Sequence, residues 1–133
     1  MTAPAPRTRS LYEMIGSEQG LDRLVQTFYD IIEQDTEAHE LHLLHLRGHG
    51  VAHSRIEQFD YLSGFLGGPR HYLQRHGHTR LREIHEHIPI DQKMRDVWLD
   101  CMRKAIVRTA IPAETADVLM AHLTRAADTT INM

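Results

Sequence analysis

The chain has 133 residues, enough for one domain with a hydrophobic core, and its hydrophobic share (41%) and charged share (25%) are typical of globular proteins. A net charge of -3 with scattered Lys and Arg predicts no nucleic-acid partner, and the single Cys101 excludes an internal disulfide or a multi-cysteine zinc site. No apolar segment has the length of a signal peptide or membrane span, so we expect a soluble, cytoplasmic protein without a membrane partner. We expect residues 1–9 to form a disordered tail and residues 10–133 a single domain.

The sequence of the first part of this domain predicts two helices. Ser10 and Glu13 have the spacing of a capping box, which predicts a short helix at this point. Residues 18–34 repeat apolar side chains at three- and four-residue intervals. This pattern predicts a long amphipathic helix with Tyr29 at the edge of its apolar stripe.

The middle of the chain predicts two more helices. Residues 36–46 favour a shorter helix that ends at Gly48-His-Gly50. Residues 54–66 carry another apolar stripe, with Ser54 as the expected cap, and Gly67-Gly68-Pro69 stops the helix.

The sequence of the last part of the chain predicts short helices followed by long ones. Residues 70–87 are interrupted by a glycine, so two short helical pieces are expected around His85. Asp91 caps a predicted helix that runs to about residue 109, and Pro112 opens the last one. Since no segment alternates like a strand, the sequence predicts an all-α fold.

Several short motifs stand in a specific order between residues 11 and 105. Each motif alone is weak evidence, but their order is specific, with Trp98 thirteen residues after His85. In this order the chain resembles the group II truncated haemoglobins, also called truncated haemoglobin O. The motifs are Tyr12-Glu-Met-Ile-Gly16, Phe28-Tyr29-Asp, Leu62-Ser-Gly-Phe-Leu-Gly-Gly-Pro69, Tyr72, Gly77-His78, Arg80-Leu-Arg82, His85, Pro89-Ile90 and Arg95-Asp-Val-Trp98-Leu-Asp-Cys101-Met-Arg.

This resemblance implies a truncated globin, a two-over-two helical sandwich around haem b. It implies that His85 is the proximal iron ligand and that Tyr29 and Trp98 are hydrogen-bond donors on the distal side. Gln58 and His45 are further candidates for distal donors. The other haem-pocket positions that it implies are Ser54, Tyr61, Leu62, Tyr72 and Arg82.

The chain departs from the family pattern beside the proximal position. Ile84 stands where the family usually has an arginine, so Arg82, Arg80 or Tyr72 is expected to contact the haem propionates instead. His87 competes with His85 as the iron ligand, but its offset of two residues turns it to another helical face.

The two distal aromatic residues have a structural and a functional interpretation. Either of them could simply fill the core, which is the usual place of an aromatic side chain on an apolar face. However, a buried phenol needs a hydrogen-bond partner, and an indole N–H can only donate. Because each such bond contributes about 1 kcal/mol, several donors together would retain dioxygen strongly.

Ten of the eleven histidines fall between His39 and His87. On one continuous helix, those between His39 and His53 would share a face and resemble a zinc or nickel site. The glycines at 48 and 50 argue against such a helix, and solvated histidines are the simplest interpretation. A further alternative is that His49 or His45 binds the iron as a sixth ligand when no gas is present.

The resemblance favours a protein that primarily binds O2, NO, CO or similar small ligands. The chemistry it implies also includes nitric oxide oxidation and slow peroxidase-like turnover, either of which needs an electron donor such as a reductase. Two alternatives remain open: a haem-free helical protein that binds a divalent metal through His39–His53, and a haem-based gas sensor that acts through a partner. Monomer and homodimer are both compatible with the sequence.

Overall fold

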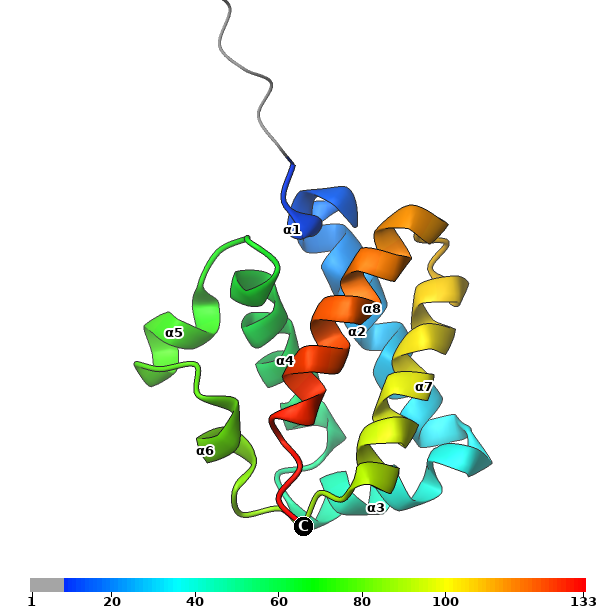
Figure 1. Cartoon of the computed structure of the whole chain (residues 1–133), viewed down its shortest axis with the longest axis vertical. Coiled ribbons are helices and arrows are strands. Elements are labelled where there is room, and N and C mark those ends of the chain that lie inside the picture. Colours follow the sequence, from blue (N-terminus) through cyan, green and yellow to red (C-terminus); the bar gives the residue numbers. More distant parts are fainter. Residues whose placement is uncertain (1–8) are drawn as a thin grey trace, which may run out of the picture.

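The computed structural model describes residues 9–133, and every regular element in that range is a helix (Figure 1). The all-α prediction is therefore confirmed, and no described helix is both long and apolar enough to cross a membrane. The expected tail over residues 1–9 lies, apart from Arg9, outside the described residues. The elements are α1 (Leu11–Met14), α2 (Ser17–Gln34), the 3-10 turn η1 (Thr36–Ala38), α3 (His39–Arg47), α4 (Val51–Phe65), α5 (His71–His76), α6 (Leu81–His85), α7 (Gln92–Arg108) and α8 (Ala113–Asp128).

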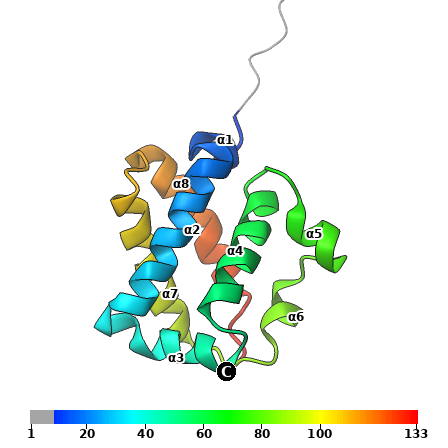
Figure 2. The same ribbon diagram turned by 180° about the vertical axis from the view of Figure 1, so that it is seen from behind.

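Four long helices form two layers. Helix α2 packs against both α4 and α7, and α7 packs against α8. Figure 1 shows α7 and α8 in front, and Figure 2 shows α2 and α4 in front from the opposite side. The predicted two-over-two sandwich is confirmed. The short helices α5 and α6 follow α4 at the edge of these layers.

Most helix ends follow the local sequence signals. The Ser10 hydroxyl oxygen accepts the N–H of Glu13, and the Asp91 carboxylate accepts the N–H of Met94 at 2.8 Å. The predicted cap at Ser54 is wrong, because α4 already begins after Gly50 and the Ser54 hydroxyl donates to the Gly50 carbonyl. A φ of 87° at Gly50 allows the chain to turn there, which few other residues would permit.

The core lies between the two layers and is centred on α2. Phe28 is fully buried, and its ring lies edge-on to Tyr29 at 4.8 Å and to Trp98 at 5.2 Å between ring centroids. The predicted apolar stripe is therefore the face of α2 that meets α4 and α7. Its buried members are Leu21, Leu24, Val25, Phe28, Tyr29, Ile31 and Ile32.

Candidate functional site

A cavity of about 440 Å³ lies between the helical layers and the short helices α5 and α6. Residues from α2 to α8 line it, so elements far apart in the sequence share one site. Much of its wall is apolar, which suits a flat hydrophobic ligand. The apolar lining residues include Leu41, Leu44, Phe65, Leu81, Ile84, Ile88, Ile90, Met94 and Leu123.

The structure brings nearly all the residues singled out from the sequence to this cavity. The exceptions are Arg80 and Arg82, whose side chains are exposed. Arg80 pairs with Glu83 instead, and Glu83 and Ile84 line the wall. The functional roles of the others stay predictions at this stage. The residues at the cavity are Tyr29, His45, His49, Ser54, Gln58, Tyr61, Leu62, Tyr72, His85 and Trp98.

His85 is held as a neutral imidazole with one free nitrogen. Its Nδ1 lies 2.8 Å from the carbonyl oxygen of Leu81, which can only accept, so the proton is on Nδ1. Burial lowers the pKa of His85, and the neighbouring His87 lowers it further. The lone pair on Nε2 is therefore available to a metal ion in the cavity.

Tyr29 presents a protonated phenol to the same cavity. The side chain is only 2% exposed, and burial raises its pKa well above the usual range. The phenol of Tyr29 and the indole of Trp98 both line the cavity. Each of these side chains carries a hydrogen-bond donor that a ligand in the cavity can meet.

His45 stands beside Tyr29, with a distance of 5.6 Å between ring centroids. Its Nδ1 donates to the Leu41 carbonyl at 2.9 Å, which leaves Nε2 with a free lone pair, as at His85. Burial lowers the pKa of His45, and His42 and His85 add smaller effects in the same direction. His45 and His85 are therefore two neutral imidazoles at one cavity, close enough to interact electrostatically.

The run of histidines from His39 to His53 does not form one row. Helix α3 ends at Arg47 and α4 begins at Val51, so the turn between them redirects the chain. The ring of His49 lies 4.8 Å from that of His53 and 6.3 Å from that of His87. Nowhere in residues 9–133 do three or more His, Cys, Asp or Glu side chains form a group that could hold a metal ion by themselves.

A polar corner beside Tyr72 was missed in the sequence. Glu57 on α4 pairs with Arg75 and with His76, whose Nε2 lies 2.7 Å from the carboxylate. Arg75 also pairs with Asp60 at 2.8 Å. Glu57, His76 and His78 line the cavity. The only sign of this polar corner in the sequence was the four-residue spacing between Glu57 and Tyr61, which places both on one face of a helix.

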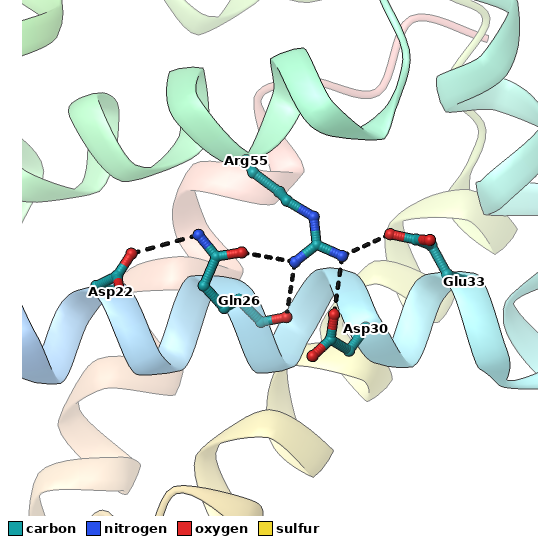
Figure 3. Close-up of polar contacts among 5 residues, drawn as sticks. All are labelled: Asp22, Gln26, Asp30, Glu33 and Arg55. Carbon is teal, nitrogen blue, oxygen red and sulfur yellow. Dashed lines mark hydrogen bonds and ion pairs between the residues drawn. The ribbon is translucent and has the colours of Figure 1, made fainter.

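Arg55 on α4 joins this helix to α2, which carries Tyr29 (Figure 3). Its guanidinium lies between α4 and α2 and donates to Asp30 at 2.8 Å and to Glu33 at 2.5 Å. It also donates to the side-chain oxygen of Gln26 at 2.7 Å and to the Gln26 carbonyl at 3.1 Å. The same group lies 5.8 Å from the centroid of the Tyr29 ring. Arg55 therefore fixes α4 relative to Tyr29.

The chemistry of these donors fits a haem group. A neutral imidazole with a free Nε2 faces a cavity with apolar walls, and polar donors surround it. The Nε of Arg95 is buried at the cavity without a hydrogen-bond partner within residues 9–133, so a donor for an anionic ligand is present as well. Nothing in this donor set conflicts with a porphyrin bound through His85.

Comparisons with known proteins agree with this fit. The family model of the bacterial-like globins matches residues 10–132. A group 2 truncated haemoglobin of Bacillus subtilis is 34% identical over 112 residues, which are 84% of this chain and 80% of that protein. The group II 2-on-2 haemoglobin of Agrobacterium tumefaciens is 33% identical with a TM-score of 0.87, covering 99% of this chain and 98% of that one.

A further solved structure has the same fold. The truncated oxygen-avid haemoglobin of Bacillus subtilis is 30% identical with a TM-score of 0.80, and the alignment covers 93% of this chain and 100% of that one. The resemblance found in the sequence motifs is thereby confirmed on independent grounds. The chain belongs to the bacterial-like globin family and has the two-over-two fold of the group II truncated haemoglobins.

Proposed function

We propose that this protein binds haem b through His85 and uses the bound iron to take up dioxygen and related diatomic gases. The globin family implies a haem cofactor and small gaseous ligands. The observation that carries the assignment is the neutral His85, whose Nδ1 donates to Leu81 and whose Nε2 is free at an apolar cavity. When bound, haem would supply an iron atom that can coordinate a diatomic gas.

On the distal side, Tyr29 and Trp98 act as fixed hydrogen-bond donors. Burial keeps the phenol protonated, so it donates over the whole physiological pH range. Since the two rings are both packed edge-on against Phe28, little reorganisation is needed when a ligand arrives. Gln58 on α4 lines the same cavity and carries an amide that can also donate.

This donor set favours retention of dioxygen over rapid release. Bonds from two or three donors, at about 1 kcal/mol each, slow dissociation by one to two orders of magnitude, roughly. A Bacillus subtilis relative is described as oxygen-avid, which agrees with this expectation. NO and CO are expected to enter the same site. NO, with an unpaired electron, is the natural reaction partner of a retained dioxygen.

His45 is the sixth ligand that we propose for the gas-free protein, ahead of His49. Its Nε2 is free, its pKa is lowered by burial, and its ring is next to Tyr29. His49 is exposed and lies in the turn between α3 and α4. For the haem propionates we propose Tyr72 and the buried Nε of Arg95 as donors in place of the arginine that Ile84 replaces.

Replacement of His85 by glycine tests the proposal. We expect His85→Gly to lose the ferrous absorption spectrum of the haem-loaded protein and to recover it with added imidazole, which can occupy the vacated position. His87→Ala is the matched control, because this histidine lines the same cavity two residues away. An unchanged spectrum in His85→Gly, together with a changed one in His87→Ala, would move the iron ligand to His87.

A further inference from the structure

The last residues of the described chain return to the segment that follows His85. After α8 ends at Asp128, the chain runs to the connection between α6 and α7, where Figures 1 and 2 mark the C-terminus. There the side-chain amide of Asn132 donates to the carbonyl of Ile88 at 2.8 Å and to that of His85 at 3.2 Å. Its side-chain oxygen accepts the N–H of Ile90 at 2.9 Å, and its own N–H donates to the Ile90 carbonyl at 2.9 Å.

The segment from His85 to Ile90 has little else to hold it. Helix α6 has only five residues, and a helix of this length has no stability of its own in water. No extensive packing joins α6 to another helix of residues 9–133. Pro89 supplies no N–H, and Ile88 donates back to the His85 carbonyl. The position of the His85 backbone therefore depends on contacts from outside its own helix.

Asparagine matches the hydrogen-bonding groups of this segment. An amide has two N–H donors and one acceptor, and the segment offers two carbonyls and one N–H within reach. Aspartate has the same shape but no donor, so its carboxylate would face the carbonyls of His85 and Ile88. Alanine would leave only the backbone bond to Ile90.

We propose that Asn132 is a positioning residue that fixes the backbone of His85 and thereby sets how the imidazole presents Nε2 to the cavity. The proposal rests on the proposed function in one respect, that His85 is the iron ligand. Asn132 touches no ligand itself. Although 47 residues separate it from His85, it acts through its hydrogen bonds to the carbonyl of His85 and to the backbone of Ile88 and Ile90.

The first measurement is amide hydrogen exchange in the haem-loaded protein. In Asn132→Ala, which removes the acceptor of the Ile90 N–H, we expect the amide of Ile90 to exchange about fivefold to tenfold faster, because each partly exposed hydrogen bond contributes a factor of a few. Asn132→Asp keeps an acceptor oxygen for this N–H, so its Ile90 amide should change less. Core amides of α2 should be unchanged. Thr129→Ala is the control, since its hydroxyl bonds only to Ala126 in its own segment.

The second measurement is the iron–histidine stretching band of the ferrous, gas-free protein in a His45→Ala background. This background removes the proposed sixth ligand, so the band reports on the proximal imidazole alone. We expect the band to shift or broaden in both Asn132 variants and to stay in place in Thr129→Ala. Asn132→Asp should be at least as severe as Asn132→Ala, because the isosteric carboxylate repels two carbonyls. A role in packing alone predicts the reverse order, with aspartate close to the native protein.

The outcomes separate this proposal from the proposed function. An unchanged iron–histidine band in both variants would overturn the positioning role, whether or not Ile90 exchanges faster. If His85→Gly leaves the haem spectrum intact, the assignment of the iron ligand fails, while the exchange experiment still reports whether Asn132 holds the segment. The test needs only one Asn132 variant that folds, as shown by a native helical circular dichroism spectrum. Either variant will serve, because each lacks the donors to His85 and Ile88.

Discussion

Replacing Arg55 with methionine removes the guanidinium that joins α4 to α2 (Figure 3). Methionine keeps an unbranched stem of similar length, so the change isolates the charged group and its hydrogen bonds. Four acceptor atoms lose their donor, including the backbone carbonyl of Gln26. The Arg55 side chain is only 19% exposed, whereas the carboxylates of Asp30 and Glu33 are about half exposed, at 54% and 42%.

These exposed fractions set the expected loss in the free energy of unfolding. The exposed carboxylates are screened by solvent, so the two ion pairs contribute at most about 1 kcal/mol together. The cation beside the Tyr29 ring and the bonds to Gln26 add about another 1 kcal/mol. We therefore expect Arg55→Met to lower the free energy of unfolding by about 2 kcal/mol.

Urea unfolding of the haem-loaded protein, followed by circular dichroism, measures this loss. Arg103→Met is the matched control, because Arg103 forms a single exposed pair with Asp100 within α7, and we expect it to cost less than about 0.5 kcal/mol. High salt should reduce the difference between the two variants only in part, since part of the effect comes from uncharged acceptors. If Arg55→Met is no more destabilising than Arg103→Met, Arg55 does not join α4 to α2.

Three other predictions concern single polar groups. Ser63→Ala should lower the free energy of unfolding in urea by about 1–2 kcal/mol, because the fully buried hydroxyl donates to the Pro69 carbonyl at 2.6 Å and its loss leaves that oxygen unpaired. A change below about 0.5 kcal/mol would contradict this. The native thiol of Cys101 should react with Ellman's reagent about a hundredfold more slowly than in urea, because burial raises its pKa to about 11; equal rates would show that it is accessible. Asp35 caps η1 and pairs with Lys104 at 2.7 Å, and this hydrogen bond is the main reason that its pKa is lowered. Asp35→Ala should therefore cost about 1 kcal/mol at neutral pH. The difference should begin to shrink as the pH falls below the unfolded pKa of about 4, and the charge contribution should be lost only below the lower native pKa, where the native carboxylate also becomes protonated; a pH-independent difference would rule out this charge effect.

The helices of this protein could be predicted because their determinants are local. The apolar stripe of α2, the cap at Asp91 and the glycine stop after α4 all act over three or four residues, and the structure agrees with them. The error at Ser54 has the same local origin. Its hydroxyl is compatible with a cap, but the chain already turns at Gly50 and the helix begins there.

The candidate site could be predicted only in part. Motif order singled out His85, Tyr29 and Trp98, and the residue types explained why they suit haem and a polar ligand. Periodicity by itself could not have gathered them, because 69 residues separate Tyr29 from Trp98 and an aromatic residue on an apolar face usually belongs to the core.

The tertiary structure alone decided which distant residues support the site. Arg55 reaches Glu33 across 22 residues, and Asn132 reaches His85 across 47. Neither partnership leaves a trace in the sequence, because no periodic pattern or capping rule extends beyond one or two helical turns. The sequence by itself determined the helices, their stripes and most of their ends. Packing of α2 against α4, and the return of the C-terminal segment to α6, determined the geometry around His85, since contacts at this range depend on the completed fold.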